Sequence, residues 1–188
     1  MSLERHRALV RELPAELRPR GCGRCLELGP RSAEVFGGFL TRRRWRYEAV
    51  DRWDVRGARD AEAFGFIDHD ADATDLMFAA TGAFELFIAQ HVIEELVDYP
   101  AALDEVARVL EPGGRALLEI PYREDRARSL RQPPDQYGNH WAFGVDLIDE
   151  LRQRFDVVEP VRVAEDDYRG VIFVCRRGGR TGQEKVGS

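Results

Sequence analysis

The sequence has no hydrophobic run long enough to cross a membrane. A spanning helix needs roughly 20 apolar residues, whereas apolar segments such as residues 86–89 end in polar groups after a few positions. Residues 1–11 carry charged side chains throughout and lack the apolar stretch of a secretory signal. The three cysteines are an odd number that does not make a disulfide framework. These absences predict a cytoplasmic protein without a membrane anchor.

The sequence also has no excess of positively charged residues. The 188 residues include 28 basic and 34 acidic side chains, a formal net charge of −6 at pH 7. An acidic chain has little general affinity for phosphate backbones, so we do not expect nucleic acid as a partner. The basic run at 42–46 is better explained as the C-terminal end of a helix that begins at Ser32.

The length and composition fit one globular domain. Hydrophobic residues make up 44% of the chain and charged residues 33%. We expect a single domain over residues 1–176, with an N-terminal helical cap at 1–20, a lid segment at 121–143 and a flexible tail at 177–188. The oligomeric state is left open between monomer and homodimer.

Strand and helix patterns alternate through most of the chain. Helical periodicity recurs over residues 3–17, from Ser32 onward, over 103–110 and over 147–155. Short apolar runs predict strands at 25–28, 47–50, 64–67, 84–89, 116–120, 157–163 and 171–175. This order predicts an α/β fold, a doubly wound Rossmann-like sheet that is mostly parallel with helices on both faces. The last two strands have no helix between them, so they predict an antiparallel C-terminal hairpin.

The ends of the first two predicted strands suggest a nucleoside cofactor. The first strand ends at Glu27 and Gly29, where a tight turn can bring main-chain N–H groups against a ligand. The second ends at Asp51, and a carboxylate there can accept both hydroxyls of a ribose. A dinucleotide loop carries three glycines, but Arg31 and Ala33 occupy the second and third places. This difference favours S-adenosylmethionine over NAD, because S-adenosylmethionine has no pyrophosphate.

Four motifs extend this pattern to a family resemblance. They are residues 25–32, Ala49-Val50-Asp51, residues 72–76, and the longest one at 84–121, which contains Gln90-His91-Val92-Ile93-Glu94-Glu95-Leu96. Over roughly residues 22–176 the chain resembles the class I S-adenosylmethionine-dependent methyltransferases, and within them the small type-11 group. In that family the first motif faces the methionine part of the cofactor, the second holds the ribose and the third holds the adenine. The resemblance implies cofactor-binding roles for Glu27, Gly29, Pro30, Asp51, Arg52, Asp72, Ala73 and Gln90.

Two positions depart from the family pattern. Arg31 stands where the first motif usually has a second glycine, and Glu95 stands where histidine is common. The first departure keeps an alternative open, a catalytically degenerate binding or regulatory module that retains the fold.

Candidate catalytic residues follow the fourth predicted strand or lie in the lid segment. Gln90 and His91 follow the strand directly, and His140 is a second candidate base within the lid. For His91 the alternative is that the ring packs under the next helix and only hydrogen-bonds the backbone. For acceptor binding we expect aromatic and polar lid residues, namely Tyr122, Tyr137, His140 and Trp141. The alternative for these aromatics is that they simply cover the sheet edge.

The resulting hypothesis is methyl transfer from S-adenosylmethionine to a small-molecule acceptor at an oxygen, nitrogen or carbon atom. The short chain leaves little room for a separate recognition domain. We predict no metal site, because Asp68-His69-Asp70 fits a solvated loop better than a ligand set, and Cys22 and Cys25 lack the partners of a zinc motif.

Overall fold

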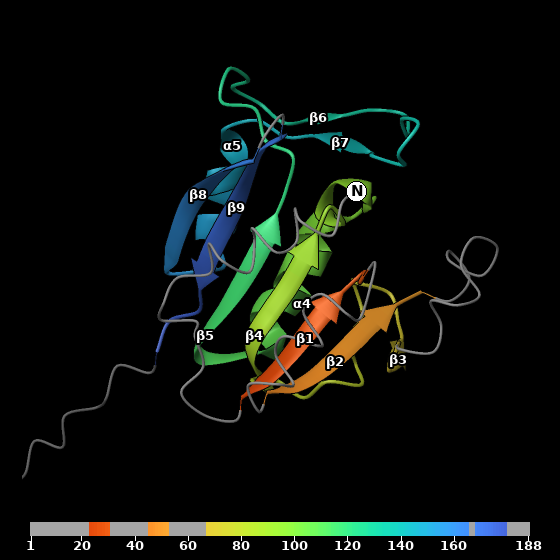
Figure 1. The fold of residues 1–188 in the computed structure, drawn as a ribbon, viewed down its shortest axis with the longest axis vertical. Coiled ribbons are helices and arrows are strands. Elements are labelled where there is room, and N and C mark those ends of the chain that lie inside the picture. The colour runs from red at the N-terminus through yellow and green to blue at the C-terminus, as the bar shows by residue number, and fades with distance from the viewer. Residues whose placement is uncertain (1–22, 31–44, 53–66, 166–167, 180–188) are drawn as a thin grey trace, which may run out of the picture.

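The structure is a computed structural model, and it describes residues 23–30, 45–52, 67–165 and 168–179 (Figure 1). Within these residues, seven strands form one sheet in the order β3-β2-β1-β4-β5-β9-β8, and a separate two-stranded sheet is made by β6 and β7. No helix in the described part of the chain is long and apolar enough to span a membrane.

The first five strands of the large sheet are parallel and the last two are antiparallel. The parallel strands are β1 (Arg24–Leu28), β2 (Arg46–Asp51), β3 (His69–Asp70), β4 (Phe84–Gln90) and β5 (Leu110–Glu119). The C-terminal strands β8 (Val157–Glu165) and β9 (Tyr168–Arg176) pair antiparallel, and β9 pairs antiparallel with β5. The predicted mixed α/β sheet with a C-terminal hairpin is therefore confirmed.

The third strand does not lie where the sequence pattern predicts it. We expected it at 64–67, but β3 begins at His69 and pairs with Val50 and Asp51 of β2. Ile67 is buried without belonging to a strand, and residues 64–66 lie outside the described residues. The prediction was wrong at Ile67 because burial alone made this residue look like part of a strand. The chain reaches β2 only at Asp68, which is hydrogen-bonded to the backbone of Ala49.

The described helices follow the expected apolar periodicity. Helix α4 (Tyr99–Val109) precedes β5, helix α5 (Asp146–Arg152) precedes β8, and a 3₁₀ turn, η3 (Ile93–Glu95), follows β4. The Asp98 side chain caps α4 by accepting a hydrogen bond from the Ala101 amide at 3.2 Å. Strands β6 (Leu130–Arg131) and β7 (Trp141–Ala142) form a short hairpin inside the expected lid segment.

Both faces of the sheet carry buried apolar side chains. One cluster combines Leu26 and Phe87 of the strands with Leu103 of α4 and Leu147 of α5, so both described helices cover the same face. The opposite face holds a smaller cluster, which includes Cys25, Leu86 and Ile88. The helices expected over residues 3–17 and from Ser32 lie outside the described residues.

Candidate functional site

The parallel strands bring most of the predicted site residues to one edge of the sheet. Leu28 at the end of β1 lies opposite Val50 of β2 and Ala89 of β4, so Gly29, Asp51 and Gln90 follow at the same level. Figure 1 shows the β6–β7 hairpin beyond this carboxyl edge, on the side of β4 and β5. Open α/β sheets bind their ligands at this edge.

Gly29 holds a tight turn at the end of β1. Its backbone is left-handed, with φ of 64°, and its N–H donates a hydrogen bond to the Val50 carbonyl at 2.9 Å. A Cβ atom at this position would lie 2.6 Å from Val92 Cγ2, so only glycine allows the segment after β4 to approach this closely. Pro30, the next residue, is buried.

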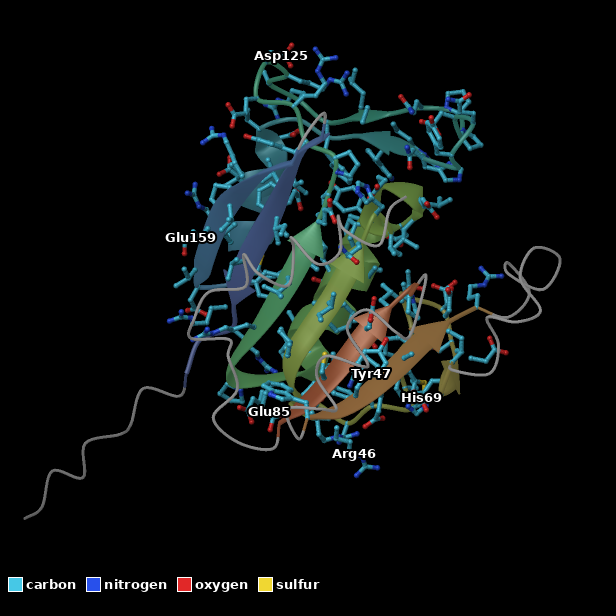
Figure 2. All side chains as sticks on the ribbon, in the orientation of Figure 1. Arg46, Tyr47, His69, Glu85, Asp125 and Glu159 are labelled. Atoms are coloured by element: carbon cyan, nitrogen blue, oxygen red, sulfur yellow. The ribbon has the colours of Figure 1, made fainter. Side chains whose placement is uncertain are left out.

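Glu27 is a buried carboxylate under this turn. Its side chain is 4% exposed, and Oε2 accepts a hydrogen bond from the hydroxyl of Tyr47 at 2.5 Å. Figure 2 labels Tyr47 on the neighbouring strand β2. Burial and the negative charge of Glu27 raise the pKa of the Tyr47 phenol, so this hydroxyl keeps its proton and remains a donor.

A second group of predicted residues links the ends of β2 and β3. Asp51 accepts a hydrogen bond from the Arg52 amide at 2.8 Å, and the Arg52 guanidinium lies 3.2 Å from the Asp72 carboxylate. Asp72 also accepts hydrogen bonds from the amide and hydroxyl of Thr74 at 2.9 and 2.7 Å. The Thr74 amide bond, helped by the Thr74 hydroxyl and Arg52, lowers the pKa of Asp72 against the opposing effect of burial. Ala73, between these residues, is buried.

This set of groups fits a nucleoside cofactor. Asp51 and Asp72 are hydrogen-bond acceptors at the ends of adjacent elements, as ribose hydroxyls and an adenine amino group require. The left-handed turn at Gly29 gives the backbone close access at the neighbouring strand end. No group of three or more His, Cys, Asp or Glu side chains in the described ranges is arranged to hold a metal ion.

Gln90 and His91 belong to a partly buried network that also includes the buried Glu94 and Glu119. The ring of His91 lies between two carboxylates, with Nδ1 3.0 Å from Glu94 Oε1 and Nε2 3.2 Å from Glu119 Oε1. The Gln90 amide donates to Glu119 Oε2 at 2.9 Å. Glu94 and Glu119 are only 1% and 3% exposed.

The two carboxylates keep His91 protonated. Burial lowers the pKa of an imidazole, but the hydrogen bonds and charges of Glu119 and Glu94 outweigh burial and raise the pKa of His91 to about 9. Neither glutamate is predicted from the sequence as a partner of His91. Glu119 lies near the end of the fifth predicted strand, so the same search of strand ends could have found it, and Glu94 lies inside the quoted motif.

The lid residues are not all brought together. The His140 amide donates to the Glu94 carbonyl at 2.8 Å, and the Trp141 ring packs edge-on against Tyr99 with centroids 4.9 Å apart. Tyr122 lies against Phe173 of β9 instead, and Tyr137 is 72% exposed. Only His140 and Trp141 of the four therefore lie beside the network that follows β4.

The comparisons with known proteins establish the family. Residues 2–158 match the family model for the methyltransferase domain, and the chain belongs to this family. It is a class I S-adenosylmethionine-dependent methyltransferase, as the motifs predict, and its cofactor is S-adenosylmethionine. No functionally curated protein sequence matches the chain.

Solved structures share the fold at low sequence identity. The crystal structure of the [4+2]-cyclase SpnF is 17% identical, with a TM-score of 0.66 over 92% of this chain and 81% of the cyclase. The Burkholderia thailandensis 1,6-didemethyltoxoflavin-N1-methyltransferase, solved with 1,6-didemethyltoxoflavin and S-adenosylhomocysteine, is 16% identical, with a TM-score of 0.66 over 94% of this chain and 79% of that enzyme. A putative methyltransferase from Bacillus halodurans is 14% identical, with a TM-score of 0.59 over 94% and 99% of the two chains.

Proposed function

We propose that this protein transfers the methyl group of S-adenosylmethionine to a small molecule that binds between the end of β4 and the β6–β7 hairpin. The observation that carries the proposal is the contact of the hairpin with the segment after β4, through His140 and Trp141. Aromatic rings beside a few polar groups are typical of small-molecule sites. The Burkholderia neighbour, which was solved with bound 1,6-didemethyltoxoflavin, supports the same proposal.

The proposed roles of the cofactor residues follow from their positions. Asp51 accepts the ribose hydroxyls, Asp72 accepts the adenine amino group, and the turn at Gly29 faces the methionine part. Arg52 holds Asp72 in place from the side of β2. The cofactor supplies a methyl group already activated on a sulfonium, so the main task of the chain is to position the acceptor.

Among the candidate catalytic residues, we infer that His140 is a better base than His91. A general base must be unprotonated before it can take a proton. His91 is protonated at neutral pH, and both of its ring nitrogens already face carboxylates. Gln90 donates its amide to Glu119, so Gln90 and His91 together position the segment after β4.

Cofactor binding is the first test of this proposal. Calorimetric titration of the purified protein with S-adenosylmethionine and with S-adenosylhomocysteine should show saturable one-to-one binding. Asp51→Ala and Asp72→Ala should each weaken binding by about 10–100-fold, because each removes a charged hydrogen-bond acceptor worth about 1.5–3 kcal/mol. The matched control is Asp149→Ala, whose side chain on α5 is 79% exposed.

Two results would contradict the proposal. One is the absence of cofactor binding by a folded wild-type protein, which would favour a degenerate module. The other is an equal effect of Asp149→Ala and Asp51→Ala.

The base assignment has its own test. With an acceptor identified by screening hydroxyl, amine and carbon compounds for S-adenosylhomocysteine release, His140→Ala should lower kcat by about 10²–10⁴-fold when the acceptor must lose a proton. His91→Gln should change kcat less than His140→Ala does. The reverse order would assign the base to His91.

A further inference from the structure

Within the described residues, one carboxylate oxygen of the network after β4 has no hydrogen-bond partner. Glu94 Oε1 faces the His91 ring at 3.0 Å, whereas Glu94 Oε2 is buried and has no hydrogen-bond partner among the residues that the structure describes. The Glu94 side chain is 2% exposed. A buried carboxylate oxygen is rarely left unsatisfied, so this atom needs an explanation.

The protonated His91 beside Glu94 also contacts a second carboxylate, that of Glu119. His91 contacts Glu119 through its other nitrogen at 3.2 Å. In the part of the chain that the structure describes, His91 is the only residue paired with the Glu94 side chain. The charge of Glu94 therefore acts on its surroundings in a region from which water is excluded, where electrostatic effects are strong.

The segment that carries Glu94 lies beside the proposed site. Two residues earlier, Val92 packs against Gly29 in the turn assigned to the methionine part of the cofactor. On its other side, the backbone carbonyl of Glu94 accepts the hydrogen bond from His140 in the lid. The backbone of Glu94 therefore lies at the junction of the cofactor turn and the β6–β7 hairpin.

We propose that Glu94 is a specificity-determining residue that provides the counter-charge for a cationic group bound at this junction. The inference rests on the proposed function. Two groups have the required chemistry, the sulfonium of S-adenosylmethionine and a protonated amine on the acceptor. Both carry one positive charge, and each has a neutral counterpart that lacks it.

The test removes the charge and keeps the shape. Glu94→Gln retains an oxygen that can accept the His91 hydrogen bond, while Glu94→Asp retains the charge on a shorter side chain. The matched control is Glu95→Gln, which removes the same charge from the exposed next residue of η3. Thermal unfolding of each variant verifies that it is folded.

The first arm compares two forms of the cofactor by calorimetry. S-adenosylmethionine carries the sulfonium charge, and S-adenosylhomocysteine is its neutral thioether product. If the sulfonium is the bound cation, Glu94→Gln weakens S-adenosylmethionine binding by about tenfold relative to S-adenosylhomocysteine, as close charge pairs do at interfaces. Glu94→Asp and Glu95→Gln keep the wild-type ratio.

The second arm compares two probes on the complex with S-adenosylhomocysteine. Benzylamine is a cation at pH 7, and benzyl alcohol is neutral and of similar shape. If the acceptor supplies the cation, wild type prefers benzylamine and Glu94→Gln loses that preference by about tenfold.

The inference is overturned when Glu94→Gln changes neither ratio, or when Glu95→Gln changes them equally. If the wild type still binds S-adenosylmethionine, the proposed function is unaffected by that result. A folded wild type that binds neither S-adenosylmethionine nor S-adenosylhomocysteine would overturn both the proposed function and the role of Glu94.

Discussion

His91 follows β4, as the sequence predicts. Its ring is paired with two carboxylates, which does not fit the predicted role of a general base. The sequence predicts His91 directly after the fourth strand as a candidate base, with packing under the next helix as the alternative. Its backbone adopts a φ of 52°, a left-handed conformation that non-glycine residues seldom use. In this conformation the ring reaches Glu94 and Glu119 at once. The strain and the ion pairs together favour a positioning role in the proposed site.

The raised pKa of His91 predicts a pH-dependent contribution to stability. A histidine that gains partners on folding stabilises the protein fully below its unfolded pKa of 6.5, and this contribution disappears as pH rises through the folded pKa of about 9. The shift corresponds to about 3 kcal/mol. In urea unfolding, the stability difference between wild type and His91→Gln should therefore be largest near pH 6 and shrink by about 3 kcal/mol near pH 9.5. A difference that is constant across this range would contradict the ion-pair assignment.

Two glycines with a left-handed backbone, Gly29 in the turn after β1 and Gly113 in β5, allow a matched comparison. Gly29 and Gly113 both have positive φ, 64° and 86°. A Cβ at Gly29 would meet Val92 at 2.6 Å, whereas a Cβ at Gly113 would meet nothing within 4 Å.

Alanine at each position should separate backbone strain from the steric conflict. Gly113→Ala should cost about 1 kcal/mol, from backbone strain alone. Gly29→Ala should cost about 1–3 kcal/mol more, because the Val92 contact adds overpacking, and it should weaken cofactor binding. Urea unfolding and calorimetry measure both effects. Val92→Ala in the Gly29→Ala background should recover part of the loss, and equal costs for the two glycines would show that Val92 plays no part.

The lid is attached to α5 by a second connection. The Asp146 carboxylate accepts hydrogen bonds from the Ser129 amide at 2.8 and 2.9 Å and from its hydroxyl at 2.6 Å, and that hydroxyl accepts one from the Gly144 amide at 3.1 Å. These Ser129 bonds, with the charge of Arg128, lower the pKa of Asp146 despite burial. The predicted lid segment is thus fixed at Ser129 by Asp146 and at His140 by the Glu94 carbonyl.

Asp146→Ala should loosen the lid without unfolding the sheet. It leaves the Ser129 donors unpaired and should cost about 1–3 kcal/mol. Hydrogen exchange at the Ser129 and Gly144 amides should accelerate, while exchange in α4 should not. Asp149→Ala, three residues along the same helix, is the control. Unchanged exchange at Ser129 would show that this connection does not restrain the lid.

At the scale of the whole molecule, the larger of the two apolar clusters in the described residues links the parallel and antiparallel parts of the sheet. The cluster runs from Leu26 of β1 through Phe87 of β4 to Phe173 of β9, with α4 and α5 packed on it. The carboxyl edge of the sheet and the predicted lid segment therefore both pack on this cluster. We expect one cooperative unfolding transition.

Ligand binding should stabilise this unit. At a free concentration of about 100 times its Kd, S-adenosylhomocysteine should add about 2.7 kcal/mol. For a chain of this length the gain corresponds to a rise in Tm of about 5–10 °C. Differential scanning calorimetry measures it, with Asp51→Ala at the same ligand concentration as the control. An unchanged Tm, or a second transition that does not respond to the ligand, would contradict this prediction.

Sequence patterns were sufficient for the class of fold and the family, and they predicted the edge at which the proposed site lies. Apolar periodicity is local, and parallel strands end at a common edge, so Gly29, Asp51 and Gln90 could be grouped without coordinates. The C-terminal hairpin followed from two strands with no helix between them. The third strand was misplaced because an apolar run is a sign of burial and does not specify pairing with β2.

The pairings within the site depended on the tertiary fold. Tyr47 with Glu27, Arg52 with Asp72, and His91 with Glu94 and Glu119 are contacts set by strand register and by one left-handed residue. A carboxylate or an imidazole acquires its charge and role from neighbours that are distant in the chain. The sequence therefore predicts chemistry at the carboxyl edge, whereas packing made His91 a cation and left one oxygen of Glu94 without a partner among the described residues.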